Sequence, residues 1–215
     1  MILLDYVSAR ELPECFRYPL DDGTPALVRH LRPEDATRLR EGFEKLSGLA
    51  RRRRFHEDLD ELSDEQLRKL VTVDQRDHFA WGAMDLAKPQ EPGIGVARYR
   101  RLQQEPDAAD VRITVLDRYM GHGAGVLLRA AIHCSAAGNG IRTFYYDVLA
   151  DNERFIRHLR ALGAEFVGRA VNVTRLKLPV FDRAIRVPHH KPNGRRFAQA
   201  MRRLASVRAE PDDAD

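Results

Sequence analysis

The residue pattern best suited to chemistry is the glycine-rich run Met120-Gly121-His122-Gly123-Ala124-Gly125. It stands between a predicted strand that ends at Leu116 and a predicted amphipathic helix that extends to Ala137. The first backbone N–H groups of a helix lack partners, and glycines let an anionic oxygen come within hydrogen-bonding distance of them. Three glycines at alternate positions therefore predict an anion or phosphate site. The other interpretation is a tight turn whose glycines only relieve backbone strain.

The spacing of the glycines narrows the kind of phosphate ligand. No run of the chain has the Walker pattern of Gly, four residues, Gly, Lys and Ser or Thr, which argues against ATP hydrolysis. The dinucleotide pattern G-x-G-x-x-G would need glycine where Val126 or Leu128 stands. Asp147, near the end of the next predicted strand, is placed where an acid binds a ribose, so nucleotide binding stays open as an alternative.

The elements around this run follow the patterns of strands and helices in alternation. Pro33 starts one predicted helix, which ends near Ser47-Gly48, and a capping box of Ser63 and Gln66 starts the next. The basic run Arg51 to Arg54 falls between these two helices and is interpreted as a solvated face, or as a contact for an acidic substrate or partner. Strands are predicted at 26–31, 78–86, 94–102, 111–116, 143–149, 166–167 and 171–178, and further helices at 121–137 and 151–162. This order implies an α+β fold with one strand-helix-strand crossover.

Length and composition limit the number of domains and the class of protein. The 215 residues, 43% of them apolar, suffice for one domain with tails. The 36 Lys and Arg nearly balance the 32 Asp and Glu, for a net charge of +4, which argues against a polycationic or acidic chain. The longest apolar run is far shorter than the roughly 20 residues of a membrane span, and no secretory signal pattern precedes it. We therefore predict a cytoplasmic protein without a membrane span, with Cys15 and Cys134 reduced.

Charge is distributed unevenly along the chain and predicts three parts. Residues 1–25 carry a net charge of −3 and form a predicted acidic leader, residues 26–180 are the predicted domain, and residues 181–215 are a basic tail. In the tail, Phe197, Met201 and Leu204 lie on one stripe of a predicted helix. We expect this helix to dock on the core or on a partner subunit. Contact with an anionic membrane or a nucleic acid is the alternative.

The stretch from Arg98 to Val167 resembles the core of the GNAT superfamily of acetyl-CoA-dependent N-acetyltransferases. The family signature, Q/R-x-x-G-x-G/A, follows the fourth strand and precedes the third helix, as 120–125 does here. Val148-Leu149-Ala150-Asp151-Asn152 and, ten residues on, Leu162-Gly163-Ala164-Glu165-Phe166 match a later family segment. A weaker similarity at 28–35 extends the resemblance over residues 26–178.

The resemblance implies a GNAT-like, mixed and mostly antiparallel central sheet flanked by helices. It also implies an acyltransferase that moves an acetyl group from acetyl-CoA, its co-substrate, to a primary amine by direct attack in a ternary complex. The acceptor is left open among a protein lysine, a protein N-terminus and a small amine. The histidines, cysteines and acids show no ligand spacing, so no metal is expected.

Residue by residue, the resemblance implies a cofactor role for ten positions. The strand backbone of Ile113, Thr114 and Val115 would bind the pantetheine arm of coenzyme A. The pyrophosphate would be surrounded by the backbone N–H groups of Gly121, His122, Gly123, Ala124, Gly125 and Val126. Asn152 matches a family asparagine that contacts the cofactor arm, and it is also a candidate helix N-cap.

Three positions depart from the family pattern. Met120 stands where the family has Gln or Arg, and His122 stands where Arg or Lys is common, which leaves mainly backbone donors for the phosphates. Leu159 occupies the position of a family tyrosine that protonates the leaving thiolate. These departures keep a second interpretation open, a catalytically weak acyl-CoA-binding sensor or structural module of the same fold.

Acetyl transfer to an amine also needs a base, because an ammonium group with a pKa of roughly 10 has no free lone pair. Many relatives use a glutamate on the fourth strand, ten residues before the signature, and Asp110 stands at that position here. We predict Asp110 as the general base, with a turn-capping role as the alternative. A third interpretation is a nucleic-acid-associated protein that uses the basic tail, although nucleic acid is not the partner we expect. A homo-oligomer is also compatible with the sequence.

Overall fold

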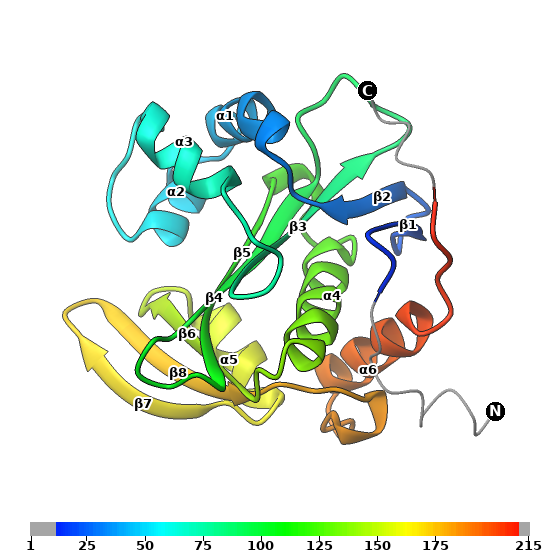
Figure 1. Ribbon diagram of the computed structural model, residues 1–215. Helices are drawn as coiled ribbons and strands as arrows, with labels where there is room; N and C mark the ends of the chain where they lie inside the picture. Colours follow the sequence, from blue (N-terminus) through cyan, green and yellow to red (C-terminus); the bar gives the residue numbers. More distant parts are fainter. Residues whose placement is uncertain (1–11, 211–215) are drawn as a thin grey trace.

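One sheet organises the chain in the computed structural model, which describes residues 12–210 (Figure 1). Its eight strands lie in the order β1-β2-β3-β4-β5-β6-β8-β7. The strands are β1 (Cys15–Pro19), β2 (Pro25–His30), β3 (His78–Asp85), β4 (Gly95–Arg101), β5 (Ala108–Val115), β6 (Thr143–Leu149), β7 (Glu165–Ala170) and β8 (Val173–Pro179). The pairing of β5 with β6 is parallel, whereas the other six neighbouring pairs in the described part are antiparallel. This mixed, mostly antiparallel sheet confirms the predicted fold class.

Helices cover both faces of the sheet. They are α1 (Ala36–Glu44), α2 (Gly48–Phe55), α3 (Asp64–Val71), α4 (Ala124–Gly138), α5 (Glu153–Ala161) and α6 (Pro192–Leu204). Helix α4 packs on β3, β4 and β5, and α6 packs on α4. Helices α1, α2 and α3 form a group on the opposite side of these strands (Figure 1).

Local sequence signals placed several elements correctly. Strand β6 has the predicted bounds, Thr143–Leu149. The Ser63 hydroxyl accepts from the Gln66 N–H at 3.2 Å, and the Gln66 carboxamide oxygen accepts from the Ser63 N–H at 2.8 Å. Helix α3 therefore begins with the predicted capping box, which satisfies two backbone donors at once.

Two local predictions were wrong in detail. The helix predicted at 121–137 begins at Ala124, because Gly121 and Gly123 have φ of +88° and +90°, outside the helical region. The basic run Arg51 to Arg54 does not separate two helices but lies inside α2. The hydroxyl of Ser47 caps this helix by accepting from the Ala50 N–H at 3.3 Å. Helix α1 already ends at Glu44, so Ser47 and Gly48 start α2 and do not end the helix before it.

Part of each predicted appendage lies on the sheet body. Strand β1, inside the predicted leader, pairs with β2 from Cys15 opposite Arg29 to Pro19 opposite Pro25. Phe197, Met201 and Leu204 of α6 are all buried, which confirms that this helix docks on the core of its own chain. Beyond α6, the Glu210 N–H donates to the Cys15 carbonyl at 2.9 Å. The boundaries at 25/26 and 180/181 stay a prediction.

The central strands β5 and β6 diverge after a short contact. They pair only from Ala108 opposite Thr143 to Asp110 opposite Tyr145. Strand β5 continues to Val115 and stays paired with β4 on its other side, so its edge toward β6 has no strand partner beyond Asp110. The sheet therefore opens between two central strands directly before the glycine-rich run.

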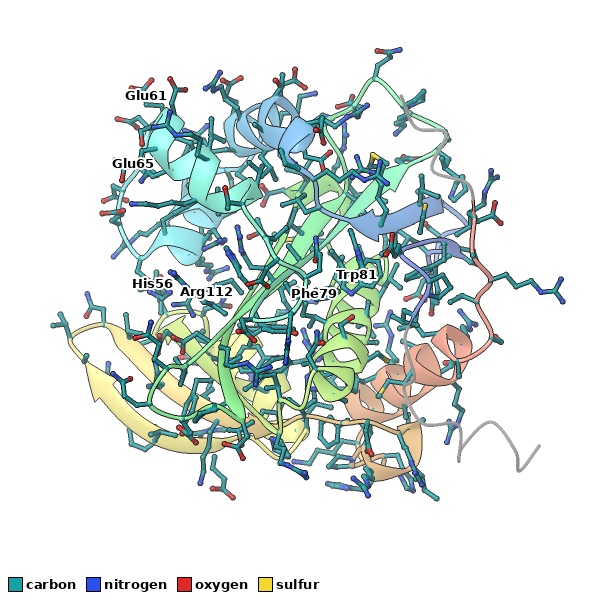
Figure 2. The ribbon with its side chains drawn as sticks, in the orientation of Figure 1. His56, Glu61, Glu65, Phe79, Trp81 and Arg112 are labelled. Carbon is teal, nitrogen blue, oxygen red and sulfur yellow. The ribbon has the colours of Figure 1, made fainter. Side chains whose placement is uncertain are left out.

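Aromatic side chains fill the core between the sheet and α4. Phe79 and Trp81 of β3 are 4% and 0% exposed and lie beside α4 (Figure 2). The indole N–H of Trp81 donates to the Ser135 hydroxyl of α4 at 2.9 Å, so the one polar atom of this ring is satisfied. Cys15 and Cys134 are both buried. Within residues 12–210, no helix is long and apolar enough to cross a membrane.

The buried His133 of α4 makes folding stability depend on pH. Its ring contacts the rings of Phe144, Phe181 and Phe197, and its Nδ1 accepts from the Phe181 N–H at 3.1 Å. Burial, with the charge of Arg129 as a smaller cause, lowers the pKa of His133 to about 3. Because an unfolded histidine has a pKa of about 6.5, protons bind the unfolded state first as the pH falls below that value.

We therefore expect the free energy of unfolding to be retained above pH 6.5 and to fall between pH 6.5 and pH 3. The contribution of His133 is about 1.4 kcal/mol per pH unit. Urea unfolding at pH 7 and pH 5 measures it. A His133→Gln variant keeps an acceptor for the Phe181 N–H but cannot titrate, so it should lose this part of the pH dependence. An equal slope in the variant and the wild type would contradict the assignment.

Candidate active site

A cleft of about 460 Å³ occupies the opening between β5 and β6. Helix α2, the glycine-rich loop, α4, α5 and the start of α6 supply its other walls. Its lining includes the end of β5 from Val111 to Val115 and Tyr146, Asp147 and Val148 of β6. A linear ligand in this cleft would thus run along an unpaired strand edge and reach a helix N-terminus.

The glycine-rich loop ends this cleft as a cradle of backbone donors. Gly123 is the N-cap of α4, and the first N–H groups with backbone acceptors in this helix are those of Val126 and Leu127, which both donate to the Gly123 carbonyl. Within the described residues no backbone carbonyl accepts from the N–H of Ala124 or Gly125. These free donors at the positive end of a helix suit an anionic oxygen.

The structure brings together eight of the ten residues to which the resemblance gives a cofactor role. Those that line the cleft are Ile113, Thr114, Val115, Gly121, Gly123, Gly125, Val126 and Asn152. The side chain of Ala124 is instead buried in the core. Asn152 is the N-cap residue of α5, but its side chain makes no capping hydrogen bond, so its amide is available to a ligand.

The side chain of His122 has a different partner. Its Nδ1 contacts the carboxylate of Asp22 in the turn between β1 and β2, and this contact holds the pKa of Asp22 well below its usual range. The neighbouring Asp21 binds Arg196 of α6, and the Asp21 N–H donates to the His122 carbonyl at 3.0 Å. Asp21 and Asp22 of the predicted leader therefore hold the glycine-rich loop in place, and the imidazole of His122 does not line the cleft.

Cationic side chains outnumber acids in the cleft. The arginines that line it are Arg53, Arg54, Arg112, Arg129, Arg154 and Arg196, against Asp117 and Asp147. Arg129 is only 5% exposed, and its Nε and Nη1 have no hydrogen-bond partner among residues 12–210. Buried charge without a partner is costly. A polyanion with phosphate groups therefore fits this donor set, whereas a cation would not.

Asp110 lies at the point where β5 and β6 separate. Its carboxylate accepts from Arg175 of β8 at 2.8 Å, and the same guanidinium binds Asp147 at 2.8 Å. Asp147 also faces Arg112 at 3.3 Å. The structure thus joins the predicted base to a second aspartate through one arginine, and of the two acids Asp147 lines the cleft.

A core residue stands at the position of the family tyrosine that protonates the leaving thiolate. Leu159 is fully buried in α5, and Met120 at the start of the signature is 51% exposed beside the cleft. The structure offers a phenol elsewhere: Tyr146 of β6 lines the cleft, and its hydroxyl is buried without a hydrogen-bond partner in the described part of the chain. Sequence reasoning missed Tyr146 because an aromatic residue on a strand is most often packing. No sequence signal distinguishes its hydroxyl from that of Tyr145, the next residue.

Comparison with known proteins decides the family. No family model matches the chain. The chain is 31% identical over 150 residues to acetyltransferase PA5475 of Pseudomonas aeruginosa, a match that covers 70% of this chain and 79% of that relative. The solved GNAT domain of S. lividans PAT superposes with a TM-score of 0.70 at 27% identity, covering 77% of this chain and 96% of that domain. The chain belongs to the GNAT superfamily. It is thus an acetyltransferase of the GNAT type, and the resemblance found in its glycine motif is confirmed.

A further GNAT relative is longer than this chain. Acetyltransferase Pat of Mycolicibacterium smegmatis is 32% identical over 157 residues, which cover 72% of this chain but 46% of Pat. The chain thus spans about half the length of that relative. Among the described residues of this GNAT protein, no group of three or more His, Cys, Asp or Glu is arranged to hold a metal ion.

Proposed function

We propose that this protein transfers an acetyl group from acetyl-CoA to a primary amine by direct attack in a ternary complex. The observation that carries the proposal is the continuity of the cleft, in which the unpaired edge of β5 leads to the N–H donors of Ala124 and Gly125. Coenzyme A has amides along its pantetheine arm and a pyrophosphate at its far end. An amide chain can extend a strand edge, and a pyrophosphate suits a helix N-terminus.

The base is proposed to be Asp110. The acceptor ammonium gives one proton to its carboxylate, directly or through a water, and the freed lone pair attacks the thioester carbonyl carbon. The new C–N bond forms, the nitrogen loses its second proton to water, the C–S bond breaks, and the thiolate takes a proton, which leaves the amide and free coenzyme A. Arg175 holds Asp110 where β5 and β6 diverge and thereby fixes the position from which the proton is removed.

The proton donor to the thiolate is proposed to be Tyr146. Burial raises the pKa of this phenol to about 12, so it is protonated at neutral pH. A thiolate whose acid has a pKa of about 8.5 is already a fair leaving group, so the donor contributes less than the typical 10²–10⁴ of general acids. We expect Tyr146→Phe to lower kcat about 10-fold.

The free energy of unfolding of the variant serves as a control for this prediction. The Tyr146 hydroxyl has no partner to lose, so its removal should not reduce the free energy of unfolding. Tyr145→Phe is the matched control, because the Tyr145 hydroxyl donates to Glu105 at 3.0 Å, and Tyr145 does not line the cleft. Initial rates of thiol release measure the effect. Equal rates for Tyr146→Phe and the wild type would remove Tyr146 from the mechanism.

The proposal is tested by calorimetry with acetyl-CoA followed by thiol release with a panel of amines. Binding with amine-dependent thiol release is the expected result. The burial of Leu159 in the core favours one second candidate, an acyl-CoA-binding sensor that lacks the thiolate acid. Binding without turnover on any amine would support that sensor. The absence of binding would refute both.

A further inference from the structure

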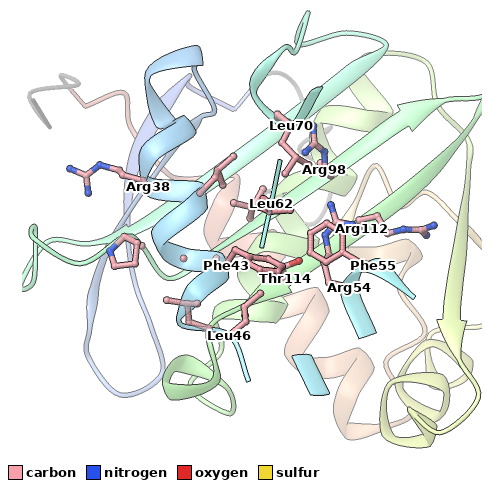
Figure 3. A pocket seen from close by; sticks show the side chains of 17 residues that line it. Arg38, Phe43, Leu46, Arg54, Phe55, Leu62, Leu70, Arg98, Arg112 and Thr114 are labelled. Atoms are coloured by element: carbon pink, nitrogen blue, oxygen red, sulfur yellow. Dashed lines mark hydrogen bonds between the residues drawn. The ribbon is translucent and has the colours of Figure 1, made fainter. Parts of the chain in front are cut away.

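A second cavity adjoins the acetyl-CoA cleft on the side of α1, α2 and α3. Its volume is about 100 Å³, and the two spaces share Arg54, Arg112 and Thr114 in their walls. Most of its wall is apolar, with Phe43, Leu46, Phe55, Leu62 and Leu70 around one space (Figure 3). A group bound here would therefore lie next to the position at which the acetyl group enters from the cleft.

The polar side chains of this cavity are almost all cations. Arg38, Arg54, Arg98 and Arg112 line it, with Thr114 as a neutral member, and no aspartate or glutamate is part of its wall. Arg38 donates to the carbonyls of Pro89 and Glu91 at 3.3 and 3.2 Å, and Arg112 faces Asp147. The N–H groups of Arg38 thus have acceptors, and the carboxylate of Asp147 offsets the charge of Arg112.

Arg54 and Arg98 lack a carboxylate partner within the described part of the chain. Arg98, 8% exposed, donates to the Leu70 carbonyl at 2.9 Å and contacts Nε2 of His78 at 2.5 Å, so both of its partners are neutral. Arg54 is partly buried, and its guanidinium carbon lies 4.9 Å from the centroid of the Phe55 ring. No carboxylate of residues 12–210 forms an ion pair with it.

The energetic cost of this arrangement points to a missing anion. Burial, with the charges of Arg98 and Arg112 as smaller causes, lowers the pKa of Arg54 to about 9. Burial also lowers the pKa of Arg98 to about 10. Two neighbouring cations in an apolar wall repel each other and lose hydration, and a bound anion relieves both costs.

We propose that this cavity binds the carboxylate and the side chain of the acceptor, which is therefore a small apolar amino acid rather than a protein lysine. The inference rests on the proposed acetyl transfer and specifies its acceptor. Guanidinium groups bind a carboxylate through paired N–H donors. A cavity of about 150 Å³ accommodates benzene, so about 100 Å³ suits a branched aliphatic side chain. The shared wall then directs the amine of that amino acid toward the cleft.

A matched set of small molecules tests the carboxylate. L-leucine has the amine, the carboxylate and the branched side chain, whereas 3-methylbutylamine lacks only the carboxylate. We expect kcat/KM for L-leucine to exceed that for 3-methylbutylamine by about 100-fold, the size of a charged hydrogen-bonded pair. Equal values for the two amines, or faster transfer to a lysine-containing peptide than to L-leucine, would overturn the proposal.

Two arginine variants of α2 identify the side chain that binds the carboxylate. Arg54→Gln should raise KM for L-leucine about 30-fold. Arg52→Gln removes the same charge from an exposed position of α2 that lines neither space, and it should behave as the wild type. An unchanged KM in Arg54→Gln would overturn the assignment.

A ligand without an amine separates this inference from the proposed function. 4-Methylpentanoate is L-leucine without its amine, and calorimetry measures its binding whether or not acetyl-CoA is bound or turned over. We expect it to bind the wild type and to bind Arg54→Gln at least 10-fold more weakly. No binding to the wild type, or equal binding to both proteins, would refute the cavity as a carboxylate site even if acetyl transfer to another amine is observed.

Discussion

A Gly123→Ala variant is expected to bind acetyl-CoA about 10- to 100-fold more weakly than the wild type. Gly123 has φ of +90°, a conformation that costs an L-residue roughly 1–2 kcal/mol. An added Cβ would lie 2.8 Å from a carboxylate oxygen of Asp21, closer than real contacts allow. The positive φ of Gly123, unfavourable for alanine, and the contact with Asp21, the partner of Arg196, together favour a shift of the loop. The shift misdirects the N–H groups that are proposed to donate to the phosphates, each worth about 1.5–3 kcal/mol to a charged acceptor.

The matched control is Gly140→Ala, beyond the other end of α4. Gly140 has φ of +77°, but an added Cβ would meet nothing within 4 Å, so this variant carries the backbone strain without the displacement of the loop. Calorimetric titration of both variants with acetyl-CoA measures the effect, and circular dichroism shows whether each is folded. An unchanged Kd in Gly123→Ala, or an equal loss in Gly140→Ala, would contradict the role of the loop.

An Asp110→Asn variant is expected to lose about 100-fold in kcat/KM at neutral pH, at the lower end of the range for a general base. The asparagine oxygen can still accept from Arg175, so the local structure should persist. The loss should shrink as the pH approaches the pKa of the acceptor amine, because the amine then loses its proton to solvent. The measurement is the pH–rate profile from pH 6 to pH 10.

Two further variants test whether the effect is specific to the carboxylate of Asp110. Asp77→Asn removes an arginine-bound carboxylate from the bend directly before β3, where Asp77 pairs with Arg101 at 2.7 Å and is 58% exposed, and it should keep the wild-type profile. Asp147→Asn removes the acid that lines the cleft and shares Arg175. A profile altered in Asp147→Asn but not in Asp110→Asn would transfer the role of the base to Asp147.

Much of the fold was predictable because its signals are local. The capping box at Ser63 and Gln66 and the apolar stripe of Phe197, Met201 and Leu204 each act over a few residues along a helix. Strand β1 was missed because its five residues have little pattern of their own. It exists through its pairing with β2, which the composition of 1–25 does not reveal.

The sequence by itself determined the backbone cradle at the end of the cleft, because positive φ at Gly121 and Gly123 and free N–H groups at a helix start are properties of consecutive residues. It also determined the family, since the motif and the helix at Asn152 stand at fixed spacing. Only the tertiary structure decided what surrounds this cradle. The ion pair of Asp110 joins residues 65 positions apart, and Arg54 meets Arg98 and Arg112 from different elements. Such contacts depend on strand register and helix packing, which a single chain position does not encode.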